Sequence, residues 1–458
     1  MQEPRRLPKD IFCTFLFVIA IVVFVIISCF AFSYGDPSTL TLPPFEEIQD
    51  EVYTFDIQEF QILKHDINWI ALSVVFSMIL SVLWFFIVKR LTAVIIYAFA
   101  MVGILIVSLF GYFLYAMGEK YGSFELVLLA VVCWIVSLVL VVALLMFRDK
   151  ILFTSKLAHV AGGVLQRNLT LLAFCLVISL IFLALVFLTL QVILYLYSIP
   201  SQETTTLFPV TASGDVMIIY DGNARILAWV VGLLALWFSR FLTCLETYVV
   251  AFVSMNEINA ETKGSRDNSP ITSALTNAFV YDFGSIAFAA SVKWLLSAIT
   301  IIARRKSESF QATCICCSTF FLKLLTILID QIVDFTLIFL SFNPFGFWKS
   351  AKKVSKVLSN DAANAIFSKI IIHYILLCGV IAFTGFVTFV TTWSIEIGHG
   401  HFGVFVPVAI LLISYFVLNV ASYAYTSTIN TVLLVLFIDK GKEQQRLPLE
   451  LTNFLTPD

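Results

Sequence analysis

Long apolar runs separated by short charged stretches limit most strongly how this chain can fold. A run of about 18 apolar residues is long enough to cross the hydrocarbon core of a bilayer as a helix. Lipid offers backbone N–H and C=O groups no partner, and a helix satisfies them within each run. We therefore expect an all-α, polytopic transmembrane helix bundle with about ten crossings. The ten runs are Ile11–Phe32, Ile67–Val88, Leu91–Met117, Phe124–Phe147, Leu169–Tyr197, Ile226–Val253, Phe283–Ile302, Cys314–Leu340, Lys369–Trp393 and Val404–Phe437.

The composition supports a membrane protein and argues against other classes. The chain is 60% hydrophobic and 13% charged, whereas soluble domains carry about 25% charged residues. Its formal net charge is -2, so it lacks the basic footprint of a nucleic-acid-binding protein. A β-barrel would need alternating apolar and polar residues, and these runs do not alternate. The lipid bilayer is the expected partner.

Basic residues indicate the orientation, because Lys and Arg collect on the cytosolic side of membrane helices. They precede the first crossing and follow the second, fourth, eighth and tenth, so we expect both termini in the cytosol. One basic stretch conflicts with this pattern, because it follows the seventh crossing on the predicted outer side. It consists of Arg304, Arg305 and Lys306. Two basic amphipathic stretches, 151–168 and 350–367, are expected along the inner interface. The predicted divisions are a cytosolic N-terminus 1–10, a first transmembrane helix 11–32, an acidic extracytosolic loop 33–66, a transmembrane core 67–437 and a cytosolic tail 438–458.

The predicted outer loop is acidic, with eight acidic residues against Lys64. Such a loop attracts cations over about a Debye length. The exclusion of basic residues from the outer side also leaves acidic residues there. Both interpretations stay open.

Charged residues inside the apolar runs are functional candidates, because charges are costly within a membrane. Lys323, Asp330 and Asp334 follow at steps of seven and four, so they share one helical face. This stripe neutralises a cation or a proton in transit, or it forms a structural ion pair, for example of Asp330 or Asp334 with Lys293. An unpaired buried charge is too costly to persist, so at least one aspartate should have a basic partner or line a water-filled path.

The tenth run carries a second polar stripe at steps of four, four, three and four residues. Quaternary ammonium groups are recognised by aromatic faces, which suits Tyr415 and Tyr423. Hydrogen bonding between helices is the other interpretation. Either way, we expect the stripe to face the protein interior. Trp294 lies deep in the seventh run, where a tryptophan packs or lines a cation pocket. The stripe consists of Tyr415, Asn419, Tyr423, Thr426 and Asn430.

Motifs for other chemistries are incomplete. Asp221-Gly222-Asn223-Ala224-Arg225 has one residue too few for the alcohol phosphotransferase motif. Cys314, Cys316 and Cys317 form the only cysteine cluster and have no second Cys/His pair nearby, as a zinc site would require. His399 and His401 lack an acidic neighbour. The chain has no P-loop for ATP, so we expect no enzyme, no metal and no cofactor.

The C-terminal half carries an ordered set of short motifs. It opens with Ser273-Ala274-Leu275, Ala278 and Tyr281. Gly284-Ser285-Ile286-Ala287-Phe288 then fits a Gly-Ser-x-Ala-Phe signature at the start of a membrane helix. Further pieces are Cys316-Cys317, Phe321-Leu322-Lys323, Phe347, Ser350-Ala351-Lys352, Val406-Pro407, Asn430-Thr431, Asp439, Pro448 and Leu451. As an ordered set, these residues resemble the choline transporter-like family.

The resemblance implies ten crossings, cytosolic termini and energy-independent movement of choline or ethanolamine, with or without proton exchange. Three positions depart from the family pattern. Asn430 stands where the family usually has Asp, Asn343-Pro344 stands near its aromatic-Gly pair, and the outer loop is short. If that Asp serves cation transport, selectivity in this chain differs.

We therefore expect facilitative or proton-coupled transport of choline or a similar small organic cation, in the plasma membrane or an organelle membrane. Binding is expected near the midplane, between the seventh, eighth and tenth crossings. The alternatives are a channel or lipid-handling membrane protein without choline selectivity, and a membrane-embedded lipid enzyme. The candidate substrate-binding residues are Tyr415, Asn419, Tyr423, Asn430, Trp294, Asp330 and Asp334.

The orientation can be tested with epitope tags. We predict that tags at both termini are cytosolic and that the loop 33–66 is outside, because of the Lys/Arg asymmetry. The measurement is protease access in sealed cells compared with permeabilised cells. Cleavage of either terminal tag from the outer side would contradict the orientation.

Overall fold

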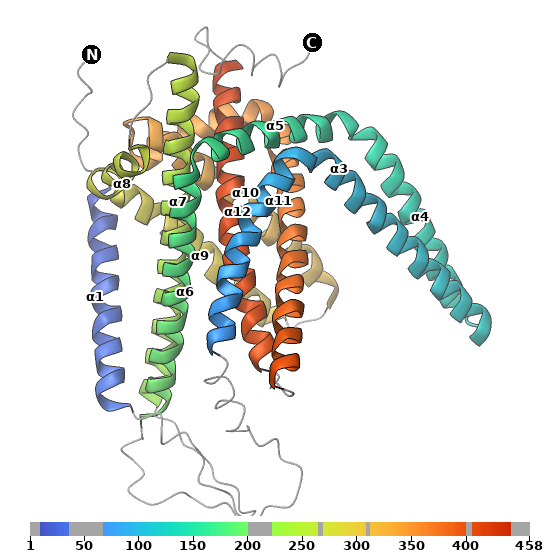
Figure 1. Cartoon of the computed structure of the whole chain (residues 1–458), viewed down its shortest axis with the longest axis horizontal. Helices are drawn as coiled ribbons and strands as arrows, with labels where there is room; N and C mark the ends of the chain where they lie inside the picture. Colours follow the sequence, from blue (N-terminus) through green and yellow to red (C-terminus); the bar gives the residue numbers. More distant parts are fainter. Residues whose placement is uncertain are drawn as a thin grey trace, which may run out of the picture.

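The computed structural model describes residues 10–35, 67–199, 222–263, 269–307, 312–399 and 405–440, and all regular structure in these ranges is α-helical. The all-α fold predicted from the sequence is confirmed. The helices are α1 (Ile11–Tyr34), α3 (Ile67–Tyr121), α4 (Phe124–Met146), α5 (Arg148–Arg167), α6 (Leu169–Tyr197), α7 (Gly222–Lys263), α8 (Pro270–Val280), α9 (Phe283–Ser307), α10 (Ala312–Phe342), α11 (Phe347–His399) and α12 (Phe405–Lys440) (Figure 1).

The described helices provide eight candidate membrane spans, or ten if each of two bent pairs counts as one span. The first bent pair joins Trp69–Trp84 to Phe86–Ile95 at an angle of 59°. The second joins Leu328–Phe342 to Phe347–Leu358 at 114°. The first pair covers most of the second predicted crossing and continues into the third. The second pair joins the end of the eighth predicted crossing to the stretch predicted along the inner interface, so the apolar runs did not show where the spans bend.

Two predicted boundaries between segments fall inside continuous helices. The second and third crossings were separated at Lys89 and Arg90, yet both belong to the single helix α3. The amphipathic stretch 350–367 and the ninth crossing also belong to one helix, α11. A charged pair does not interrupt the backbone hydrogen bonds of a helix, because only Pro and Gly strongly disfavour helical backbone. Three predicted features lie outside the described residues. They are most of the acidic loop 33–66, the tail beyond Lys440, and His401 of the pair His399 and His401.

Helix α12 is the centre of the bundle. It packs against α3, α5, α6, α7, α10 and α11. Its residues from Ile429 to Phe437 are all buried, as expected for a helix that is enclosed on every side. Helix α5 crosses one end of the bundle, and α1 begins at the same end at which α12 finishes (Figure 1). That arrangement fits an even number of crossings.

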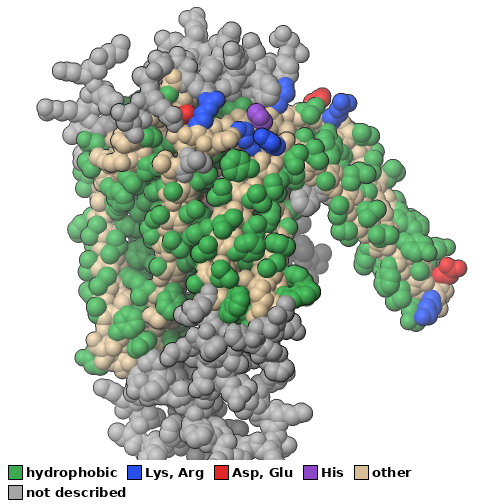
Figure 2. Space-filling view, in the orientation of Figure 1, with side chains coloured by type: hydrophobic (Ala, Val, Ile, Leu, Met, Phe, Trp, Pro, Cys, Tyr) green, Lys and Arg blue, Asp and Glu red, His purple; other side chains and the backbone are tan. Residues whose placement is uncertain are grey.

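The second half of α3 and helix α4 form a hairpin that leaves the bundle (Figure 1). Its helices approach closely at Gly111, beside Trp134, and at a 3.1 Å hydrogen bond from Ser108 to Ser137. Small residues of this kind allow membrane helices to pack. Figure 2 shows hydrophobic side chains along the hairpin and the bundle, with charged side chains gathered at the end that carries α5 and at the hairpin tip.

A close contact between α3 and α11 holds the bend of α3 against the bundle. Trp84 is buried and its ring lies edge-on to Phe383, with centroids 5.3 Å apart. Gly379 gives the indole room, because a Cβ atom there would lie 2.1 Å from the Trp84 ring. The packing of α3 against α11 therefore depends on glycine, which has no side chain, at position 379.

We predict that Gly379→Ala lowers the apparent melting temperature, because the added methyl forces Trp84 to move. Overpacking of this kind costs about 1–3 kcal/mol. The measurement is thermal unfolding in detergent, followed by size-exclusion chromatography. Gly385→Ala is the matched control on the same helix, because nothing lies within 4 Å of its Cβ position. Equal melting temperatures of the two variants would contradict the packing argument.

Candidate functional site

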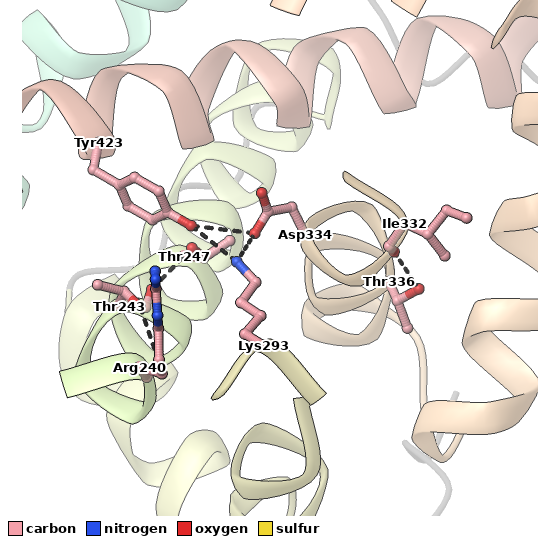
Figure 3. Close-up of polar contacts among 8 residues, drawn as sticks. All are labelled: Arg240, Thr243, Thr247, Lys293, Ile332, Asp334, Thr336 and Tyr423. Atoms are coloured by element: carbon pink, nitrogen blue, oxygen red, sulfur yellow. Dashed lines mark hydrogen bonds and ion pairs between the residues drawn. The ribbon is translucent and has the colours of Figure 1, made fainter. Parts of the chain in front are cut away.

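A lysine and an aspartate pair inside the bundle. Lys293 on α9 lies 2.5 Å from Asp334 on α10, measured from Nζ to Oδ1, and their side chains are 5% and 9% exposed (Figure 3). This pair was one of the interpretations of the charged stripe, and the expectation that at least one aspartate has a basic partner or lines a water-filled path is confirmed by Asp334. Because removing a charge from water costs several kcal/mol, such a pair persists only with good geometry.

Small residues bring Lys293 close to its partners. Along α9, Ala287, Ala289 and Ala290 are almost fully buried, and α9 packs against both α7 and α10. Side chains as small as Ala let membrane helices approach closely. A lysine in the middle of such a helix therefore has nowhere to reach water and must find a carboxylate.

Tyr423 on α12 completes a three-membered group. Its hydroxyl oxygen accepts a hydrogen bond from Lys293 Nζ at 3.2 Å. The same hydroxyl donates a hydrogen bond to Asp334 Oδ1 at 3.2 Å. The ammonium also lies 5.8 Å from the centroid of the tyrosine ring, within the range of a cation–π contact. Thr243 and Thr247 of α7 lie beside this group (Figure 3). Four helices therefore surround one ammonium ion.

Arg240 on α7 extends the charge cluster. Its guanidinium donates to Ser297 on α9 at 3.0 Å, and Ser297 in turn donates to the carbonyl of Lys293 at 2.9 Å. This contact was not predicted from the sequence. Arg240, Lys293, Asp330 and Asp334 all lie within electrostatic reach of the buried thiol of Cys244, so two positive and two negative groups are gathered there.

Two tryptophans border the cluster on the side of α7. Trp294 stacks on Trp237 with ring centroids 5.9 Å apart and donates from Nε1 to the carbonyl of Leu233 at 3.0 Å. The Nε1 atom of Trp237 is buried and has no hydrogen-bond partner among the described residues. Because Trp294 follows Lys293 directly in the sequence, its side chain points towards α7 while the lysine points towards α10 and α12.

The predicted stripe on α12 is only partly brought together. Tyr423 joins the charge cluster, whereas Tyr415 is half-buried in a separate apolar cluster around Val380 and Ile410. Asn430 is buried, as predicted, and its Oδ1 atom has no hydrogen-bond partner among the described residues. The interior position predicted for Asn419 is wrong, because that residue is exposed. The helix is covered on all sides only towards its C-terminal half, so a constant stripe spacing does not give constant burial.

On α10, Asp330 is half-buried one turn before Asp334, and its charge acts on Lys293. The side chain of Lys323 lies outside the described residues. Lys293 was predicted only as a possible partner of an aspartate, and Arg240 was not among the predicted site residues. Both are ionisable residues within predicted crossings, which is the same signal that identified the aspartates.

Eight to ten candidate membrane spans around a buried cluster of charges define a multi-pass integral membrane protein with a polar centre. The sequence profile of a family described as plasma-membrane choline transporters matches residues 131–441. The chain belongs to this choline transporter-like family, which is a family of transporters. It is also similar to a CTL-like protein of Dictyostelium discoideum, with 23% identity over 411 residues that cover 82% of this chain and 75% of the relative.

The ion pair can be tested by a double-mutant cycle. We predict that Asp334→Asn lowers thermal stability by about 3–5 kcal/mol, because it leaves a buried ammonium without its counter-charge. Adding Lys293→Met to Asp334→Asn should restore part of the loss, because no charge then remains unpaired. Asp330→Asn, at a half-buried position on the same helix, should have a smaller effect. If Asp334→Asn unfolds at the same temperature as the wild type, the pair does not stabilise the bundle.

Proposed function

We propose that the protein carries choline, or a small organic cation like it, across the membrane and binds it at the charge cluster. The observation that supports this best is the position of the Lys293 ammonium. It is held by the carboxylate of Asp334 and lies near the ring of Tyr423. A carboxylate beside an aromatic face is the combination that attracts a quaternary ammonium, which has no N–H group to donate.

The location of the cluster also supports a transport site. Tyr423 lies close to the middle of α12, and Lys293 and Asp334 lie on two further candidate spans. Binding sites of transporters lie near the midplane, between helices that can move relative to one another. In this proposal, Asp334 and Tyr423 bind the cation, Asp330 adds negative charge, and Trp294 borders the site.

Charge balance suggests how a cation would be exchanged. Lys293 and Arg240 offset Asp330 and Asp334, so an added cation would leave a buried excess of positive charge, which is costly. A positive charge therefore has to leave, either by movement of the Lys293 ammonium away from Asp334 or as a proton. Under this proposal Lys293 occupies the substrate position in the empty transporter. Transport is then facilitative or proton-coupled, according to which charge leaves.

The proposal is tested with radiolabelled choline and ethanolamine in proteoliposomes. We expect saturable choline uptake, with KM nearly unchanged in Tyr423→Phe and roughly tenfold higher in Tyr423→Leu. The reason is that the aromatic face contributes up to about 2 kcal/mol to cation binding in a desolvated site. Tyr374→Leu, at an exposed position on α11, is the control and should match the wild type.

Two outcomes would contradict parts of the proposal. Uptake that rises linearly with choline concentration would indicate a channel, which is the main alternative. Saturable uptake with equal KM in the Phe and Leu variants would retain the transporter but exclude Tyr423 as the cation-binding ring.

A further inference from the structure

One carboxylate joins three helices at the end of the bundle where α1 begins. Asp10 directly precedes α1, and its Oδ2 atom accepts a hydrogen bond from the hydroxyl of Ser285 in the first turn of α9 at 2.6 Å. The same oxygen accepts from the backbone N–H of Phe347, the first residue of α11, at 3.4 Å. We call Asp10, Ser285 and Phe347 the Asp10 latch.

Electrostatics favour this contact. The first N–H groups of a helix have no partner within the helix and carry partial positive charge. The N-termini of α9 and α11 meet at Asp10, so a single negative charge serves two helix ends. Ser285 and Phe347 are buried, which shields the contact from water. The latch therefore draws α1 towards two helices that are far from it in the sequence.

The backbone of Asp10 is shaped for this role. Its φ and ψ angles are 53° and 42°, and it is the only residue other than glycine with positive φ in the described part of the chain. Aspartate is among the few residues that adopt this left-handed conformation. Residues held in it cluster at functional and switching sites, where surrounding contacts maintain them.

The latch is mechanically linked to the charge cluster. Ser285 lies eight residues before Lys293 on α9, about 12 Å along the helix axis. Phe347 lies directly after the sharp bend that ends α10, the helix that carries Asp334. Asp10 therefore contacts the helix that carries Lys293 and, through Phe347, the residue that follows the bend after the helix that carries Asp334. A buried hydrogen bond of 2.8 Å from Tyr248 of α7 to Asp282 strengthens the same end.

We propose that the Asp10 latch is a gate on the path to the charge cluster. While Asp10 bridges α9 and α11, the end of the bundle at which α1 begins is closed. When the bridge opens, α1 separates from the two helix ends and the cluster becomes accessible from that side. The proposal requires only that access alternates between the two sides, so it does not depend on which cation is carried.

Cys244 is a natural reporter for this gate. It is fully buried on α7 and lies within electrostatic reach of Lys293 and Asp334. The chain has nine cysteines, and the other eight can be replaced by serine or alanine. A membrane-impermeant methanethiosulfonate with a quaternary ammonium group is applied to vesicles of each orientation. The rate at which it modifies Cys244 measures access from each side.

We expect Asp10→Asn to raise the modification rate about tenfold from the side on which α1 begins, and not from the other side. A tenfold change corresponds to about 1.4 kcal/mol. Asp10→Gly should behave in the same way, because glycine keeps the left-handed backbone but removes the carboxylate. Asp149→Asn removes an exposed carboxylate of α5 at the same end and should leave both rates unchanged.

Two results would overturn the gate. The first is an unchanged rate in both Asp10 variants when the protein remains folded. The second is an equal rise from both sides, which would show general loosening of the bundle. If the Asp10 variants cannot be recovered folded, Ser285→Ala tests the same contact with Asp10 still present. A one-sided rise in Ser285→Ala supports the gate, and unchanged rates exclude it.

Discussion

A charged side chain inside an apolar helix bundle needs a side chain of opposite charge as its partner. The interior of this protein is arranged around one such ion pair, Lys293 and Asp334. Lys293 cannot reach water from the middle of α9, so α10 must present Asp334 at its height. Tyr423 satisfies both groups from α12, the helix that contacts most of the bundle. The register of three helices is thereby set by a few polar atoms, because apolar packing alone tolerates sliding of one helix along another.

Small residues at the helix contacts allow the helices of the bundle to approach one another closely. Alanines on α9 allow it to approach its neighbours, and Gly379 on α11 accepts the indole of Trp84. Lipid supplies no hydrophobic force between helices, so close packing and interhelical hydrogen bonds must hold the bundle together. This explains why the small residues lie at helix contacts, while large apolar side chains cover the surfaces that face outward (Figure 2).

Polar contacts divide the bundle into two levels. The charge cluster lies among the middle turns of its helices, and the Asp10 latch lies at the end where α1, α9 and α11 begin. Both levels share α9 and the segment from α10 to α11, which is the connection that the proposed gate uses. A sharp bend after Phe342 turns the chain by 114° between α10 and the start of α11.

Hydropathy alone predicted the all-α fold and the position of the spans, because a bilayer allows few other solutions for long apolar runs. Helical spacing also predicted that Asp330 and Asp334 share a face, and the cost of buried charge predicted that one of them would be paired. Spacing was not enough for Asn419, because burial depends on which neighbouring helix covers a given turn.

The tertiary structure decided which charges meet. Lys293 and Asp334 are 41 residues apart, and Asp10 and Phe347 are separated by 337, so no local pattern connects them. The bend in α3 was also invisible in hydropathy, since apolar residues continue through it, whereas Asn343, Pro344 and Gly346 interrupt the apolar run at the bend after α10. The sequence determined that this chain spans a membrane and carries charges within it. Only the packing of the helices determined where those charges are brought together, because each one is paired by residues on another helix.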